Sequence, residues 1–298
     1  MISSTKFIQA MKKIAFLLFF SFILSSLFAQ PKKRKRYGME YINSIQFTAG
    51  TGTGTYYGDL CDNTDCMVFR PQTSVGIIYR NSERLLFRSE FNYIMLYGED
   101  KGGLNNTRNL HFRSHNYEIT ASAIYDLIPY ERKFRYRSPI TPYAFGGLGV
   151  TSFNPQAKIN NEWLYLRPLE TEGVSYSSIT PVISYGFGLR YKLTPEINIS
   201  AEAGYRWTFT DYLDDVSTVY IDNSTLEGNA ALLADQTKNS GANPKAADYD
   251  KSTLTWNAGH KRGNPDRNDG YFLFGFKVEY RIKYTEQSGG IFKRAKFR

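Results

Sequence analysis

The sequence predicts an all-β protein that folds as an eight-stranded up-and-down antiparallel transmembrane β-barrel, with short periplasmic turns and long extracellular loops. Three observations lead to this fold class. Large apolar side chains alternate with charged or small ones along several segments, which is the period-2 pattern of a strand with two different faces. The connections between these segments alternate between short and long. The only long apolar run lies near the N-terminus, so no helix is predicted to span a membrane in the mature chain.

Residues 11–30 form that apolar run and read MKKIAFLLFFSFILSSLFAQ. Lys12 and Lys13 precede the apolar core, and the sequence LFA precedes Gln30. This is the pattern of a secretory signal peptide over residues 1–29, with Met11 as an alternative start. An N-terminal membrane anchor is the other interpretation of the same stretch.

Eight segments are predicted to be strands. Five alternate clearly, namely residues 85–97, 117–127, 183–193, 197–209 and 270–284. Three alternate more weakly, namely residues 44–57, 72–80 and 141–153. In residues 141–153 glycine and leucine occupy both faces, so the sequence does not assign an outward side there.

The last segment shows what the two faces need. Phe272, Phe274 and Phe276 lie on one face, and Lys277 and Glu279 lie on the other. A soluble barrel also has one apolar and one polar face, turned inside out. Here the charged face also carries small residues, which suits an interior just wide enough for side chains. The apolar face is aromatic toward the strand ends, which is typical of membrane interfaces.

We therefore expect lipid to contact the aromatic face and a packed network of ion pairs to fill the lumen. The predicted network consists of Arg88, Glu90, Glu118, Arg190, Glu202, Arg206, Lys277, Glu279 and Arg281.

One barrel accounts for the chain between residues 41 and 284. The 298 residues, 42% of them hydrophobic, suffice for one large all-β domain. Residues 210–269 are read as a long loop with a helical turn at residues 229–236. An even number of strands places both termini at the short-turn end, so residues 30–40 and 285–298 are predicted to be basic periplasmic segments.

Cys61 and Cys66 are the only cysteines, in the sequence GDLCDNTDCMVF. An exported chain meets an oxidising compartment, so we predict a small loop-closing disulfide between them. Two free thiols are the alternative. A metal site with Asp59, Asp62 and Asp65 is disfavoured, because the spacing matches no calcium loop and two cysteines without histidine make a poor zinc site.

The sequence offers little for catalysis. His111, His115 and His260 are the three histidines, and all fall in or beside long loops. No histidine stands at a telling spacing from a serine or an acid. The segment GTGTGTYYGDL superficially resembles a phosphate loop, but it lacks the Lys-Ser/Thr ending and no helix follows. We predict no enzymatic activity, no cofactor and no metal, and an exported chain is not expected to bind nucleic acid.

Three motifs carry a resemblance to a known family. They are TYYGDL at residues 55–60, TPYAFGGLGV at 141–150 and AEAGYRWTFTDYLDDVS at 201–217. With them, about residues 40–284 resemble the PorG-like outer-membrane barrels of the type IX secretion system. The resemblance implies a structural component of the secretion machinery that docks on a periplasmic ring made of a lipoprotein and its partner protein. The paired cysteines and the long fourth loop depart from the pattern and are compatible with a paralogous role.

Positive charge gathers on the predicted periplasmic side, whereas residues 210–269 are net acidic. The basic positions are Lys32, Lys33, Arg34, Lys35, Arg36, Arg132, Lys133, Arg135, Arg137, Lys293, Arg294, Lys296 and Arg298. They are interpreted either as contacts to anionic headgroups of outer-membrane lipid or as a docking face for a periplasmic protein. A stand-alone barrel of the OmpA/OmpX type, for adhesion or envelope integrity, is the rival function, and an envelope enzyme has little support.

Overall fold

The computed structural model describes residues 42–61, 66–100, 105, 107–131, 133–240, 249–252 and 255–282. The predicted signal peptide and both basic terminal segments lie outside the described residues. Within the described part of the chain, no helix is long and apolar enough to cross a membrane.

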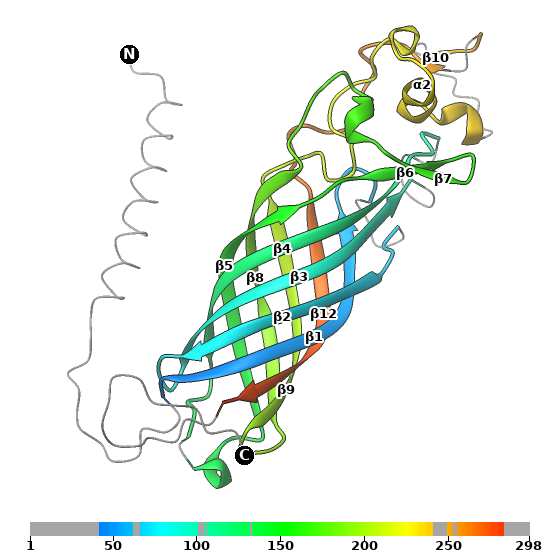
Figure 1. The fold of residues 1–298 in the computed structure, drawn as a ribbon. Helices are drawn as coiled ribbons and strands as arrows, with labels where there is room; N and C mark the ends of the chain where they lie inside the picture. Colours follow the sequence, from blue (N-terminus) through cyan, green and yellow to red (C-terminus); the bar gives the residue numbers. More distant parts are fainter. Residues whose placement is uncertain are drawn as a thin grey trace, which may run out of the picture. The chain divides into compact units, whose positions relative to one another are not determined.

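Eight long strands of the described residues close into an antiparallel barrel, as the sequence predicts (Figure 1). They are β1 (Ser44–Tyr57), β2 (Arg70–Arg80), β3 (Leu85–Glu99), β4 (His111–Asp126), β5 (Ile140–Ser152), β8 (Ile179–Lys192), β9 (Ile197–Thr208) and β12 (Gly270–Arg281). Each strand pairs with its neighbours along the chain, and β1 pairs with β12 to close the cylinder.

Two strands, β4 and β8, begin four or more residues earlier than predicted. The outward positions at the start of β4 are His111, Arg113 and His115, so the apolar alternation is visible only from Tyr117 onward. These first residues still pair with the end of β3, where His111 lies opposite Glu99. Backbone pairing therefore extends the strand beyond its amphipathic part.

The two faces of the barrel follow the predicted alternation. On β12, the buried and exposed positions alternate from Tyr271 to Arg281. Phe274 and Phe276 point outward and are 43% and 55% exposed. Lys277 and Glu279 point inward and are buried. The outer surface of the cylinder is thus a continuous apolar belt, and the polar side chains are inside.

The structure assigns the faces of β5, which the sequence leaves open. Tyr143, Phe145 and Thr151 point into the lumen, whereas Leu148 and Val150 point outward and are 67% and 49% exposed. On this strand two aromatic rings are inside, so the rule that aromatic side chains face outward fails here.

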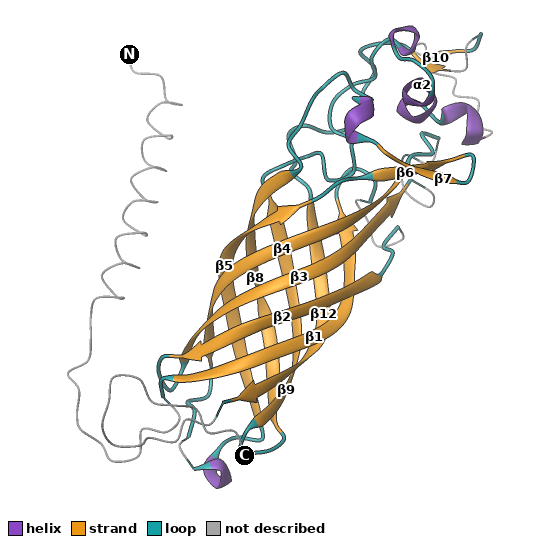
Figure 2. Ribbon diagram, in the orientation of Figure 1, coloured by secondary structure: helices purple, strands orange, loops and turns teal. Residues whose placement is uncertain are grey.

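The four long connections fold together over one end of the barrel, and we call their described residues within 58–69, 100–110, 153–178 and 209–269 the cap (Figure 2). The cap contains β6 (Gln156–Ile159), β7 (Glu162–Tyr165), η2 (Arg167–Leu169), η3 (Asn223–Thr225), α2 (Asn229–Ala234), η4 (Thr237–Ser240), β10 (Tyr249–Asp250) and β11 (Thr255–Trp256). The helix α2 confirms the predicted helical turn. The hairpin β6–β7 extends the barrel sheet beyond β4.

A hydrophobic core joins the cap to the lumen. Inward side chains of the barrel, such as Ile94, Leu96 and Leu273, belong to the same buried cluster as Leu213 and Leu233 of the cap. The long connections are therefore packed against the barrel and against one another.

At the opposite end the connections are short. Residues 81–84 join β2 to β3, and residues 193–196 join β8 to β9. The connection between β4 and β5 carries the single-turn helix η1 (Phe134–Tyr136). Lys192 Nζ donates hydrogen bonds to the carbonyl oxygens of Phe134, at 3.2 Å, and Arg137, which fixes this turn to β8.

Replacing Phe274 tests which face meets lipid. A basic residue at the bilayer midplane costs roughly 2–4 kcal/mol, so Phe274→Arg should strongly reduce the fraction that folds in vesicles. Phe274→Leu, the matched control, should fold like the wild type. The measurement is heat-modifiable gel migration, in which the folded unboiled barrel migrates faster. Equal folding of the two variants would mean that this face does not contact lipid.

Candidate functional site

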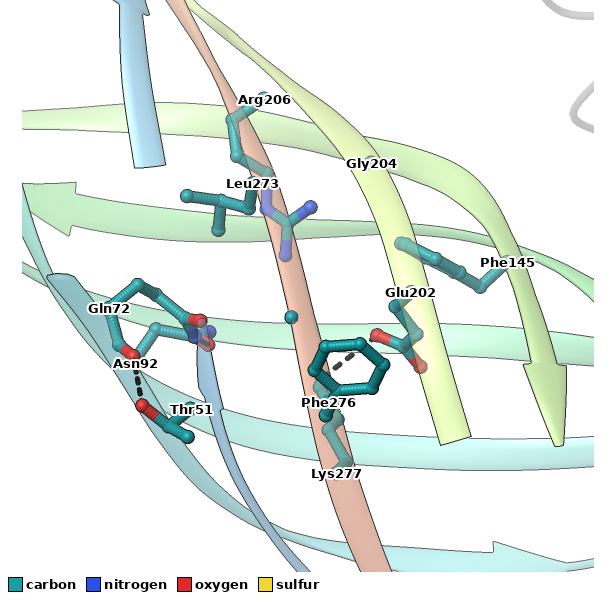
Figure 3. Close-up of a pocket in the computed structure, with 11 residues that line it drawn as sticks. Thr51, Gln72, Asn92, Phe145, Glu202, Gly204, Arg206, Leu273, Phe276 and Lys277 are labelled. Carbon is teal, nitrogen blue, oxygen red and sulfur yellow. Dashed lines mark hydrogen bonds and ion pairs between the residues drawn. The ribbon is translucent and has the colours of Figure 1, made fainter. Parts of the chain in front are cut away.

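The middle of the lumen holds four interlocked charges contributed by three strands. Figure 3 shows two of them, Glu202 and Lys277, beside a small cavity. Arg88 of β3 pairs with Glu202 of β9, and its Nε lies 3.6 Å from Glu90 Oε2. Lys277 of β12 pairs with Glu90 and lies 2.9 Å from Glu202 Oε2. Tyr143 donates a hydrogen bond of 2.7 Å to Glu202. Two positive and two negative groups thus neutralise one another across the barrel.

Two further groups of charges lie on either side along the axis. Toward the cap, Glu118 accepts hydrogen bonds from Tyr271, at 2.5 Å, and from Arg206, at 3.4 Å. Toward the turn end, Arg190 contacts Glu279 at 2.7 Å and Asp126 at 2.5 Å.

The structure adds partners that the sequence did not single out. Arg80 lies 3.0 Å from Asp126 and is fully buried. Asp126 lies on the polar face of its predicted strand, so the alternation could have identified it as a lumen residue. Tyr143 lies on β5, whose faces the sequence did not assign, so no such signal was available for it. Arg281 is buried at the turn end, where its backbone N–H donates to Glu196 at 2.8 Å. All nine predicted lumen residues are buried, and eight of them meet in these ion pairs.

Glycines in the lumen make room for aromatic rings as well as for charged side chains: a Cβ at Gly50 would lie 2.6 Å from Cγ of Lys277. A Cβ at Gly204 would lie 2.7 Å from Cζ of Phe145, and one at Gly186 would lie 2.8 Å from the same atom. The inward rings of β5 occupy that space. The cavity that remains beside Glu202 measures about 20 Å³, which is room for about one water molecule. Side chains therefore fill this level of the barrel.

A second site lies in the cap, where Tyr56 meets two carboxyl groups. Its hydroxyl lies 2.7 Å from Asp214 Oδ2 and 2.6 Å from Asp269 Oδ1. A hydroxyl has one proton to donate, so one of these two contacts requires a proton on the carboxyl group. Burial, followed by the charge of Asp59, raises the pKa of Asp214 well above its usual value. Burial and the charge of Asp214 do the same to the pKa of Asp269.

Neighbouring carboxylates tie further parts of the cap together. Asp215 accepts hydrogen bonds from Thr171 at 2.5 Å and from Tyr176 at 2.6 Å, and burial raises its pKa to about 6. Glu172 accepts from Arg262 at 2.7 Å. Burial acts to raise the pKa of Glu172, but the charge of Arg262 and the hydrogen bonds from Ser217, Arg262 and Thr218 together outweigh burial, so the pKa is lowered. We call this group, with Tyr56, Asp214 and Asp269, the carboxyl cluster.

Two of the motifs that carry the family resemblance converge on the carboxyl cluster. Tyr56 belongs to TYYGDL, and Asp214 and Asp215 belong to TDYLDDVS. The aspartates of this acidic string are buried.

The two cysteines form a disulfide, with an S–S distance of 2.22 Å and a Cα–Cα distance of 5.4 Å. Both are buried in the hydrophobic core of the cap, beside Leu60. Asp62 and Asp65, from the disfavoured metal site, lie outside the described residues. Among the residues that are described, no group of three or more His, Cys, Asp or Glu could hold a metal ion.

The histidines lie in separate surroundings. Nε2 of His111 accepts a hydrogen bond from the backbone N–H of Lys158 at 3.0 Å. Nδ1 of His115 lies 2.6 Å from the hydroxyl of Tyr93. His260 stacks on Trp256 at 3.8 Å. Ser114 and Glu118 face the lumen, on the opposite side of β4 from His115.

The predicted basic docking face is only partly within the described residues. Lys133 and Arg135 are exposed on the turn between β4 and β5. Arg137 is buried: it stacks on Tyr130, 4.2 Å from the ring centroid, and donates to the carbonyl of Glu131 at 3.0 Å. Arg137 thus supports the turn and is not part of an exposed surface, which corrects its predicted role. Arg132 and the basic residues at 32–36 and 293–298 lie outside the described residues.

A family model described as a domain of unknown function, DUF6089, matches residues 35–229. The chain belongs to the DUF6089 family. No curated protein sequence matches this DUF6089 chain.

Several solved outer-membrane structures are similar to the DUF6089 barrel at low identity. Neisserial surface protein A is 12% identical with a TM-score of 0.40, covering 79% of this chain and 96% of that one. The N-terminal barrel domain of Pseudomonas aeruginosa OprF is 11% identical with a TM-score of 0.36, covering 80% and 98%. Ail, the attachment invasion locus protein of Yersinia pestis, is 10% identical with a TM-score of 0.37, covering 80% and 99%.

The carboxyl cluster and the neighbouring buried Asp211 predict that the cap loosens as pH rises. The pKa of Asp215 is raised to about 6 and that of Asp211 to about 9, in both cases mainly by burial. The folded cap therefore holds protons that an unfolded aspartate, with a pKa of about 3.9, has released. Between about pH 4 and pH 9 the free energy of cap opening should fall as pH rises, by up to about 1.4 kcal/mol per pH unit for each such proton.

Amide hydrogen exchange in residues 209–217 between pH 5 and pH 9, corrected for the intrinsic pH dependence of exchange, measures this loosening. Asp214→Asn removes one titratable carboxyl group of the cluster and should flatten the dependence. Glu227→Gln, an exposed change in the same connection, should leave it unchanged. A cap whose corrected protection is constant with pH would contradict the prediction.

Proposed function

We propose that this protein is a non-enzymatic outer-membrane β-barrel of the stand-alone type, which contributes to adhesion or envelope integrity through contacts of its outer cap. The observation that carries the proposal is a lumen filled by paired charges and continuous with a folded cap. A barrel that is filled in this way is suited to holding a surface in place and is poorly suited to passing solutes.

The apolar belt supports a membrane location. Exposed apolar side chains lie on strands around the cylinder, and they include Ile77 of β2, Leu148 of β5, Phe187 of β8 and Phe276 of β12, at 49–71% exposure. Soluble monomers rarely expose contiguous apolar patches larger than a few hundred Å². In lipid, a closed barrel satisfies every backbone hydrogen bond of its strands. A signal peptide and a lipid-facing barrel together favour the outer membrane, with the long connections outside.

Epitope tags at the two ends test this orientation. One tag is inserted between Asn160 and Asn161, in the turn of the cap hairpin, and the other between Ser82 and Glu83, in a short turn. Antibody should label intact cells carrying the first tag, and should label the second only after the outer membrane is permeabilised. The purified wild type should also give no stepwise conductance in planar bilayers. The reverse labelling, a soluble periplasmic protein, or an open channel would contradict the proposal.

A second candidate function is a structural component of the type IX secretion machinery. The resemblance of TYYGDL and TDYLDDVS suggests it, and one observation favours it: the turn between β4 and β5 displays Lys133, Arg135 and Tyr136, the last 59% exposed. In this function, the basic turn docks on a periplasmic ring made of a lipoprotein and its partner protein. Contact with anionic lipid headgroups is the competing use of the same charges.

Pull-down of periplasmic proteins separates these uses. Exposed ion pairs contribute only about 0–1 kcal/mol each, so a single substitution should have little effect on capture. The test variant therefore combines Lys133→Gln and Arg135→Gln with removal of residues 285–298. Capture of the ring proteins should fall, and should fall further with salt. Lys158→Gln with Lys251→Gln, which changes two exposed charges in the cap, is the control. Wild-type protein that captures no ring component would contradict the secretion function and leave the stand-alone barrel in place.

A further inference from the structure

The cap contains a cavity of about 280 Å³ between the segment that follows β1 and the segment that precedes β12. Four of its lining residues are cationic, namely Arg108, Lys261, Arg262 and Arg267. Asp59 is the one carboxylate among its lining residues. The lining is therefore positive in a region of the chain that is acidic overall.

The two buried arginines form a fixed wall. Arg108 is 6% exposed and contacts Asp100 through Nε at 2.9 Å and Nη2 at 2.6 Å. Arg262 is 3% exposed and donates to Glu172 at 2.7 Å and to the carbonyl of Asp215 at 2.6 Å. Their charges are compensated by these carboxylates, so they shape the cavity but do not supply its excess charge.

The excess charge comes from Lys261 and Arg267 at the rim. Both are exposed, and neither forms a salt bridge with a carboxylate among the described residues. Arg267 is held in place by Tyr57: its Nη2 donates to the Tyr57 hydroxyl at 2.8 Å, and its guanidinium carbon lies 5.1 Å from the ring centroid. Its other N–H groups are available to an anion without a change of position.

The negative charge of Asp59 does not cancel the positive charge of Lys261 and Arg267. Its Oδ2 accepts a hydrogen bond of 2.6 Å from the backbone N–H of Asn264, which fixes the carboxyl group to the wall. One carboxylate against two rim cations leaves a positive balance. Asn105 and Asn264 also line the cavity and bring amide groups that can bond to hydroxyl groups.

We propose that this cavity binds a sugar-sized anion, with a phosphate or sulfate group held between Lys261 and Arg267 and hydroxyl groups directed toward the asparagines. The volume is close to the lower end of ordinary ligand pockets, which begin at about 300 Å³. It exceeds the needs of a bare inorganic ion and suits a monosaccharide that carries one anionic group. The inference rests on the proposed function in one respect, because a ligand from outside the cell reaches the cavity only if the cap is external.

The test is calorimetric titration of the purified full-length protein in detergent. Glucose 6-phosphate should bind and glucose should not. Lys261→Gln with Arg267→Gln should weaken binding of glucose 6-phosphate by roughly tenfold or more, and Lys158→Gln should leave it unchanged. Both changes affect exposed side chains, and unchanged heat-modifiable migration shows that the double variant still folds.

Several outcomes would overturn the inference. These are absence of glucose 6-phosphate binding at about 10 mM ligand, equal binding of glucose, or equal binding by the double variant. Binding of phosphatidic acid in doped micelles without binding of glucose 6-phosphate would also overturn it, and would assign the same contacts to a lipid headgroup. The titration needs no membrane topology, so its failure is distinct from a failure of the tag-labelling experiment.

Discussion

The width of the lumen is the constraint on which the rest of the structure depends. Eight strands leave an interior just wide enough for side chains, so inward charges have neither bulk water nor space to separate. An unpaired buried charge costs several kcal/mol, and each one must therefore meet an opposite charge from another strand. Arg88 on β3 meets Glu202 on β9, and Lys277 on β12 meets Glu90 on β3. These contacts cross the barrel, and they couple the registers of strands that are not neighbours.

The same constraint explains how the cap is supported. Above the charged middle, the inward side chains become apolar at Ile94, Leu96 and Leu273. Apolar side chains at the end of the lumen are stabilised when other residues shield them from water. Leu213 and Leu233 of the long connections pack against them. The carboxyl cluster lies where barrel and connections meet, so its buried charges oppose the hydrophobic contacts that hold the cap down. Protonation of these carboxyl groups removes their buried charge, so the contact between barrel and cap depends on pH. In the middle of the lumen the positive and negative side chains are paired, and their charges cancel.

Local pattern was enough to predict the eight strands, because period-2 alternation needs only neighbouring residues. It failed for the faces of β5, where Tyr143 and Phe145 point inward into space left by glycines on other strands. It also failed for the cap. Nothing in the local pattern places the acidic string beside β1, yet the hydroxyl of Tyr56 forms a hydrogen bond with Asp214 across a sequence separation of 158 residues. Contacts between such distant segments follow from barrel closure, and a single sequence does not reveal them.

A filled barrel restricts where function can lie. If solutes do not pass through the centre, the protein acts through its two ends, and these ends differ in chemistry. The cap buries its carboxyl groups and leaves Lys261 and Arg267 exposed at the rim of a cavity. The turn end buries Arg137 against Tyr130 and leaves Lys133 and Arg135 exposed. At both ends, buried arginines support the local structure, and exposed lysine and arginine side chains can contact other molecules. The closed sheet lies between these two cationic surfaces and separates them.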